Sequence, residues 1–194
     1  MEIKIDKNKT GLVVIDLQKG IVGRDAKPNS AADVVARASA LADSFRKNSM
    51  PVFLVHVGGS ADGKDRLSPI TDSANPWTSA KMPPDWSEIV PELGPYAGDQ
   101  VILKKQWGAF YGTDLDLQLR RRGLDTIVLC GISTNIGVES TARFAFEYGY
   151  QQIFVKDACS AMSAEAHENS FSEIFSRMGR IRSAQDVLDC LAKN

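Results

Sequence analysis

Short apolar runs recur along the whole chain and alternate with stretches of helical periodicity. Runs of this kind, bounded by turn residues, are typical of strands buried on both faces of a sheet. Strands that alternate with helices join in parallel through crossover connections. We therefore predict an α/β fold, with a doubly wound, mostly parallel six-stranded sheet and helices on both faces. The runs that predict strands are 11–16, 51–57, 100–104, 126–130, 152–157 and 180–182.

The stretches between these runs carry signals for helices. Several begin with a serine or threonine followed three residues later by an aspartate, a pattern that caps helix N-termini. Neither a linker nor a low-complexity tract divides the chain, so we expect a single domain over residues 1–194. The predicted helices span 30–48, 114–122, 163–178 and 183–191, with another after residue 131.

Two charged residues stand at the ends of predicted strands. Asp16 ends the run 11–16, and Lys104 ends the run 100–104. Open α/β sheets bind ligands at the carboxyl ends of their strands, so both residues are candidates for a site there. The alternative for Asp16 is that it only caps the turn that follows.

The stretch from Gly131 to Arg143 follows a buried strand and leads into a helix. Thr134 and Asn135 are good N-cap residues at this junction. The first N–H groups of such a helix suit an anion or a developing oxyanion. An ordinary strand-to-helix turn is the alternative reading of the same pattern.

A long irregular segment covers residues 58–99. It contains six prolines and two tryptophans, Trp77 and Trp86. Irregular segments of this length are usually functional or disordered, and the tryptophans favour order. We predict either a wall or lid over a pocket, or a surface excursion that packs on a neighbouring subunit.

The composition excludes several classes of function. Lys and Arg number 23 and Asp and Glu 24, so a nucleic-acid or membrane-surface partner has little support. No apolar run is long enough to span a membrane, and the N-terminus lacks a signal-peptide core. The three cysteines have no metal-ligand spacing, which favours a reducing, cytoplasmic setting.

Three segments of the chain together resemble the isochorismatase-like hydrolases, a superfamily that includes nicotinamidases, carbamoylsarcosine amidohydrolases and isochorismatases. The resemblance spans most of the chain and implies a strand order of 3-2-1-4-5-6. It also implies a homo-oligomer that acts on a small molecule. The segments that carry it are 13–18, which reads VVIDLQ, then Lys104 with 108–115, GAFYGTDL, and 131–143, GISTNIGVESTAR.

The resemblance implies roles for individual residues. Asp16 matches the family's essential aspartate and Lys104 its lysine, while Lys105 fits the spacing less well. Ser133 and Gly137 lie in the oxyanion-hole segment, where the family has a cis peptide that corresponds to Ile132–Ser133. The residues expected around the substrate are Gln18, Trp107, Phe110, Tyr111, Thr134 and Asn135.

We predict no metal and no other cofactor. The nicotinamidase branch binds a metal through Asp and His residues after its second strand, where this chain offers only His56 and Asp62. We expect His56 to be a core histidine, and His167 to lie on a helix surface or at an interface.

Most members of the superfamily have a cysteine nucleophile where this chain has Gly137. Glycine has no side-chain nucleophile, so a thioester mechanism is not available at this position. The bacterial isochorismatases also lack the cysteine and hydrolyse a vinyl ether by acid–base chemistry. We therefore predict that Asp16 is a general acid/base with Lys104 as its partner, acting on an isochorismate-like compound or another small carboxylate.

Two alternatives remain open. In the first alternative, the chain is a hydrolase of an amide or imide that uses water activated by Asp16. In the second, it is a binding protein that kept the pocket and lost turnover. Retention of both Asp16 and Lys104 favours an enzyme, although a buried ion pair can also be structural. No cysteine is expected to take part: Cys130 should be buried in a strand, Cys159 should sit in a turn and Cys190 should lie on the last helix.

Overall fold

The computed structural model describes residues 3–73 and 82–193, and its centre is a sheet of six parallel strands. The strand order is β3-β2-β1-β4-β5-β6, which confirms the predicted doubly wound sheet and the order that the resemblance implied. The strands are β1 (Thr10–Ile15), β2 (Val52–Val57), β3 (Gln100–Lys104), β4 (Thr126–Ile132), β5 (Gln151–Ser160) and β6 (Arg180–Arg182).

Most helices lie where the periodicity predicts, and the short α1 falls in a stretch for which no helix was predicted. Ser30 caps α2 by accepting a hydrogen bond from the Asp33 N–H. The helix expected over 163–178 is instead three joined segments, the middle one a π-helix. The helices are α1 (Lys19–Val22), α2 (Ala31–Lys47), α3 (Leu115–Arg121), η1 (Thr134–Val138), α4 (Glu139–Glu147), α5 (Ala164–Asn169), η2 (Ser170–Phe175), α6 (Ser176–Met178) and α7 (Ala184–Lys193).

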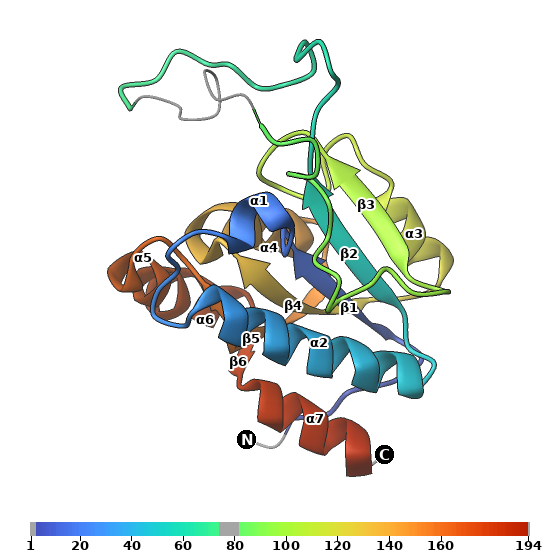
Figure 1. Cartoon of the computed structure of the whole chain (residues 1–194). Helices are drawn as coiled ribbons and strands as arrows, with labels where there is room; N and C mark the ends of the chain where they lie inside the picture. Colours follow the sequence, from blue (N-terminus) through green and yellow to red (C-terminus); the bar gives the residue numbers. More distant parts are fainter. Residues whose placement is uncertain (1–2, 74–81, 194) are drawn as a thin grey trace.

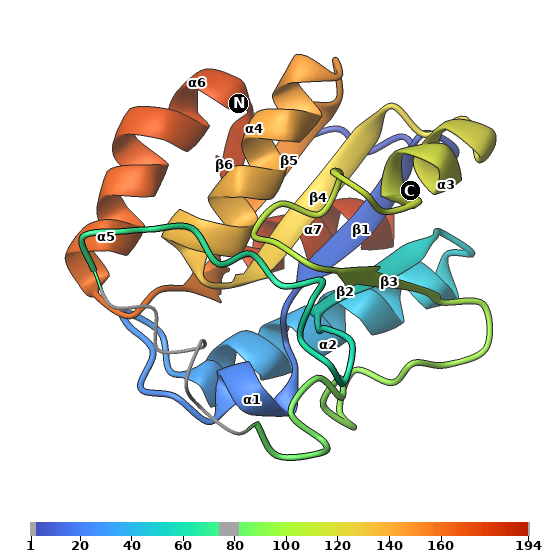
Figure 2. The same cartoon turned by 90° about the horizontal axis from the view of Figure 1, so that it is seen from above.

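The helices form two layers around the sheet. Helix α2 lies along one face with α7 beside it, and α3, α4, α5 and α6 cover the other (Figures 1 and 2). Every residue of β1 is buried, and the last six residues of β4 are buried as well. Strands covered on both faces need apolar side chains in both directions, which is why these strands read as continuous apolar runs.

Strand β5 is longer than its apolar pattern predicts. Its pairing with β4 shifts between Leu129 and Gly131, and beyond this irregularity Cys159 pairs with Gly131. Cys159 therefore lies buried in a strand, and the expectation that it sits in a turn is wrong. Cys130 in β4 and Cys190 in α7 lie where they were predicted, and both are buried.

The first part of the 58–99 segment projects from the body of the molecule (Figure 1). Its exposed side chains include two large apolar ones, Leu67 and Ile70. At its base, Asp65 accepts hydrogen bonds from Ser60 and pairs with Lys105 at 2.7 Å. Trp77 lies outside the described residues. Whether this segment is a wall over a pocket or a contact with a neighbour stays a prediction.

No helix in the described part of the chain has the length and apolar character needed to cross a membrane.

Gly131 provides a test of how closely β4 and β1 approach one another. Its φ is +130°, and a Cβ there would lie 2.1 Å from the Ile15 carbonyl oxygen. We predict that Gly131→Ala lowers the free energy of unfolding by more than about 3 kcal/mol, since the backbone clash adds to the cost of a left-handed alanine. Urea denaturation of the purified protein measures this.

Gly98 supplies the matched control, because its φ is +98° and nothing lies within 4 Å of its Cβ position. Gly98→Ala should cost only about 1–2 kcal/mol, the penalty of the backbone conformation alone. Equal losses for the two variants would contradict a tight contact at Gly131.

Candidate active site

Asp16 and Lys104 meet at the carboxyl end of the sheet. Lys104 Nζ lies 2.8 Å from Asp16 Oδ2 and also donates to the Gln106 carbonyl oxygen at 3.0 Å. The side chains are 2% and 8% exposed, so the ion pair is almost entirely removed from water. Two residues separated by 88 positions in the sequence are thereby held within hydrogen-bond distance.

The sheet topology explains why this pair consists of a lysine and an aspartate. Strand β2 lies between β1 and β3, so the two backbones are roughly 10 Å apart, twice the spacing of neighbouring strands. A lysine side chain is long enough to extend across β2. Asp16 has a φ of 54°, a left-handed conformation that aspartate tolerates better than most residues.

Burial dominates the electrostatics of Asp16. Removal from water raises the pKa of this carboxyl above its ordinary value, and the opposing effect of Lys104 is smaller. Oδ2 bonds to Lys104, whereas Oδ1 is buried without a hydrogen-bond partner among the described residues. A carboxyl group with a raised pKa is suited to both accept and donate a proton.

Gly137 faces this ion pair directly. A Cβ on Gly137 would lie 3.0 Å from Asp16 Oδ2 and 3.6 Å from Lys104 Nζ. The absence of a side chain therefore leaves the carboxyl group and the ammonium group next to the backbone of η1. A side chain at this position would contact both.

The segment that contains Gly137 differs in detail from the predicted helix start. The Ile132–Ser133 peptide is cis, as the resemblance implied, and η1 is a π-helix in which the Val138 N–H bonds to the Ser133 carbonyl. Thr134 and Asn135 were expected as N-caps, but both lie inside this π-helix. The residue that precedes it is Ser133, whose side chain makes no capping bond.

The residues expected around the substrate lie in different environments. Gln18 is fully buried, and its amide bonds to the backbone of Val57 and Trp86, so it braces the end of β2, while its contact with a substrate stays a prediction. Phe110 is also buried and packs on Tyr148 and Tyr150, which places it in the core.

The remaining predicted contacts are polar or exposed. Trp107 and Tyr111 follow Lys104 in the chain and are 64% and 70% exposed, and Asn135 is exposed as well. Thr134 is buried, and its hydroxyl lies 2.9 Å from His167 Nδ1. Their contact with a substrate stays a prediction.

His56 is near enough to Asp16 to lower the pKa of that carboxyl, which is the smallest of the effects on it. The strand register pairs His56 with Leu103 and Val57 with Lys104, so His56 shares a sheet face with Leu103 and its Nδ1 bonds to the Ser87 carbonyl. His167 was expected on a surface but is fully buried, which lowers its pKa to about 4. Among the described residues, no group of three or more His, Cys, Asp or Glu side chains is placed to hold a metal ion.

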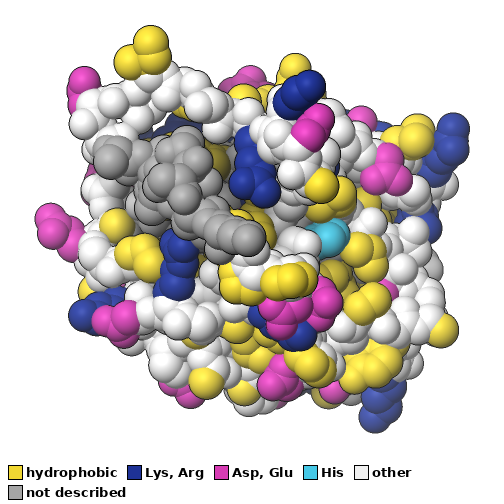
Figure 3. Space-filling view, turned by 45° about the horizontal axis from the view of Figure 1, so that its top comes forward, with side chains coloured by type: hydrophobic (Ala, Val, Ile, Leu, Met, Phe, Trp, Pro, Cys, Tyr) yellow, Lys and Arg dark blue, Asp and Glu magenta, His cyan; other side chains and the backbone are white. Residues whose placement is uncertain are grey.

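The face above the carboxyl ends of the strands is mixed in character. Among the described residues drawn in Figure 3, hydrophobic side chains lie between isolated acidic and basic ones. A surface of this kind suits a small molecule with both apolar and polar groups better than a polyanion.

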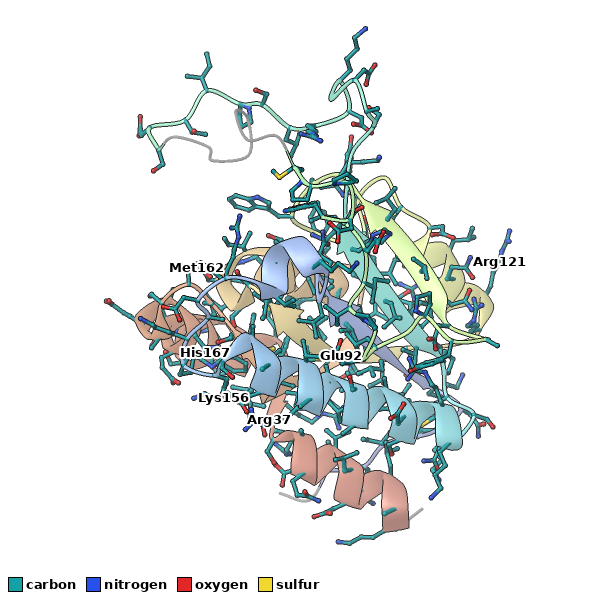
Figure 4. The ribbon with its side chains drawn as sticks, in the orientation of Figure 1. Arg37, Glu92, Arg121, Lys156, Met162 and His167 are labelled. Atoms are coloured by element: carbon teal, nitrogen blue, oxygen red, sulfur yellow. The ribbon has the colours of Figure 1, made fainter. Side chains whose placement is uncertain are left out.

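A hollow of about 430 Å³ lies at the β5–β6 side of the sheet. His167 and Lys156 border it, on the side of the molecule away from Arg121 (Figure 4). Lys156 is paired with Glu168, and Asp157 with Arg37. These pairs are solvent-exposed, whereas the Asp16–Lys104 pair is almost fully buried, so the Asp16–Lys104 region is the stronger candidate for chemistry.

Sequence reasoning missed Thr141, a fully buried residue one turn beyond Gly137. Its hydroxyl donates to the Gly137 carbonyl oxygen and accepts from the Ala109 N–H. A threonine four residues after the glycine was visible in the sequence. Its second partner was not, because Ala109 is 32 positions away.

The family of the chain follows from comparison with known proteins. Residues 10–186 match the family model described as the isochorismatase domain. The chain therefore belongs to the isochorismatase family, and it is a hydrolase of that superfamily.

Three relatives illustrate the range of similarity. The chain is 54% identical to the uncharacterized isochorismatase family protein YwoC of Bacillus subtilis (strain 168) over 187 residues, which cover 96% of each protein. An isochorismatase family protein from Burkholderia thailandensis has a structure with a TM-score of 0.93 and 44% identity, covering 99% of this chain and 100% of that one. N-carbamoylsarcosine amidase from Thermoplasma acidophilum gives a TM-score of 0.72 and 32% identity, with coverage of 91% and 96%.

Removal of the Lys104 charge should show how much free energy it costs to bury the Asp16 charge without a partner. We predict that Lys104→Met lowers the free energy of unfolding by about 3–5 kcal/mol at pH 7, because the Asp16 charge is left unpaired. A raised pKa in the folded state means that this carboxyl stabilises most below its ordinary pKa of 3.8 and loses that contribution as the pH rises. The loss relative to the wild type should therefore be smaller at pH 5 than at pH 7 in urea denaturation.

The double variant Lys104→Met with Asp16→Asn is the control, since it buries no charge at this place. It should recover most of the stability lost by the single variant at pH 7. A double variant as unstable as Lys104→Met would mean that packing, and not the unpaired charge, causes the loss.

Proposed function

We propose that this protein hydrolyses a small organic molecule by acid–base chemistry, without a covalent enzyme intermediate. Asp16 is the general acid/base, Lys104 is its charge partner, and the preferred substrate is a vinyl ether that carries a carboxylate, similar to isochorismate. The observation that carries this proposal is the buried Asp16–Lys104 pair beside Gly137. A Cβ placed on Gly137 would lie only 3.0 Å from Asp16 Oδ2.

The positions of the cysteines support a mechanism without a thiol. Cys130 and Cys159 are fully buried in strands, and burial raises the pKa of Cys159 to about 12 and that of Cys130 well above its ordinary value. Such thiols are poor nucleophiles because almost none of the thiolate is present. Cys190 lies on the last helix, α7, and its thiol donates to the Ile3 carbonyl. This position is remote from the carboxyl end of β1.

In the proposed reaction Asp16 gives one proton to the substrate and receives another from water. The protonated Asp16 gives its proton to the terminal vinyl carbon, the C=C electron pair forms the new C–H bond, and the ether carbon becomes an oxocarbenium ion. Lys104 stabilises the carboxylate that results. Water then attacks the cation and returns a proton to Asp16, and the hemiketal breaks down into a ketone and an alcohol.

Hydrolysis of an amide or imide is the second candidate. The similarity to a structure named as an N-carbamoylsarcosine amidase favours it. In this reaction Asp16 is the base that activates water, so the carboxylate is the working form. The two candidates therefore demand opposite protonation states of the same group.

Asp16→Asn should abolish turnover of whichever substrate class is active in a panel of vinyl ethers, amides and imides. The amide has nearly the shape of the carboxyl group but does not exchange the proton, so we expect a loss of at least about 10²–10⁴-fold in kcat. In the wild type, kcat/KM should fall as the pH rises through the raised Asp16 pKa for a vinyl ether, and rise for an amide. Steady-state rates across pH measure both.

Asp99 offers the matched control. It is an equally buried carboxylate, 2% exposed and paired with Arg46 at 2.9 Å, but it precedes β3 at the opposite end of the strand from Lys104. The Asp99→Asn variant should be less stable than the wild type but should keep the same kcat. A folded Asp16→Asn protein with substantial activity would overturn the proposed role.

A variant without thiols should keep its rate on the same substrate. Cys130→Ala, Cys159→Ala and Cys190→Ser together should cost about 1–2 kcal/mol of stability per buried core site but leave kcat unchanged, because no thiol takes part. Rates measured well below the melting temperature test this. Iodoacetamide should likewise leave the folded wild type active, and a loss of turnover without unfolding would indicate a thiol nucleophile.

A further inference from the structure

Thr141 joins two segments that border the Asp16–Lys104 pair. Its hydroxyl donates a hydrogen bond to the Gly137 carbonyl oxygen at 2.7 Å and accepts one from the Ala109 N–H at 3.1 Å. The side chain is fully buried, so water does not replace either bond. The hydroxyl therefore uses its single donor and one of its acceptor sites inside the protein.

The bond to Gly137 alone would not indicate a special role, because threonines in helices often donate to the carbonyl four residues earlier. The bond from Ala109 is different, since it crosses from α4 to the loop that follows Lys104. A threonine is required to serve both partners: a valine has the same shape but neither donates nor accepts.

The loop that Thr141 holds is also tied to the ion pair at its other end. Lys104 Nζ donates to the Gln106 carbonyl, and the Gln106 amide donates to the carbonyls of Gly108 and Tyr111. The contacts thus run from Asp16 through Lys104 and this loop to Thr141, and from Thr141 to Gly137. Since Gly137 faces Asp16 again, they form a closed ring around the site.

From this ring we infer that Thr141 is a positioning residue for the hydrolysis, an inference that rests on the proposed function. It fixes the backbone of Gly137 and the loop after Lys104 relative to the Asp16 carboxyl group. Thr141 touches neither the substrate nor the transferred proton. Its loss should therefore change the alignment of the reacting groups, while the chemical groups themselves stay in place.

Thr141→Val and Thr141→Ser separate the hydroxyl from the shape of the side chain. Displacement of catalytic groups by about 1 Å can cost about 10²-fold in rate, so we expect Thr141→Val to lower kcat by about 10–100-fold with little change in KM. Thr141→Ser keeps both hydrogen bonds and should stay within about threefold of the wild type.

Hydrogen exchange gives a second readout that needs no substrate. In Thr141→Val the Ala109 N–H loses its acceptor, so peptides that cover residues 105–113 should exchange faster than in the wild type or in Thr141→Ser. Thr10→Val is the control, because Thr10 is 1% exposed and stands at the amino end of β1, away from the site. It should leave kcat and this exchange unchanged.

The outcomes separate the inference from the proposed function. An inactive Asp16→Asn beside a Thr141→Val with wild-type kcat overturns the inference alone, as does unchanged exchange of 105–113. Equal losses in Thr141→Ser and Thr141→Val also overturn it. Activity in Asp16→Asn overturns the proposed function, and the role assigned to Thr141 with it.

Discussion

The buried ion pair between Asp16 and Lys104 is the interaction on which the candidate site depends. Taking both charges out of water costs several kcal/mol each, and only close, well-oriented contact offsets this. The pair sits 2.8 Å apart across an intervening strand. Strand β2 sets this distance, because the Asp16 N–H bonds to the Val55 carbonyl and the Gly58 N–H bonds to the Lys104 carbonyl. The backbone of one strand therefore aligns both partners.

Close backbone approach on the other side of β1 completes the arrangement. Gly131 lets β4 lie against Ile15, and Gly137 lets η1 lie against Asp16. Side chains at these two positions would meet backbone in the first case and the ion pair in the second. The two glycines thus serve different purposes: one permits the sheet to form at this end, and the other leaves space beside the carboxyl group.

The sequence predicted those parts of the structure that depend on local pattern. Asp16 and Lys104 each end an apolar run, and parallel strands bring such ends to one edge, so periodicity placed both at that edge, while the resemblance supplied the strand order and the pairing. The environments of Gln18, Phe110 and His167 did not follow, since they are set by partners far along the chain: Trp86, Tyr148 and Thr134. Cys159 was misplaced because Lys156 and Asp157 interrupt the apolar pattern while the strand continues past them.

The raised pKa of Asp16 and the glycine at 137 have a common consequence under the proposed function. A thiol at that position would need Asp16 as a charged base, and burial works against that charged form. Without a thiol, the protonated form that burial favours is the form that donates a proton to a vinyl ether. The same buried pair then serves acid catalysis directly: the raised pKa favours uptake of the proton by Asp16, and Lys104 stabilises the carboxylate before the proton arrives and after it has left. Desolvation, which is a cost to the fold, becomes the property that the chemistry uses.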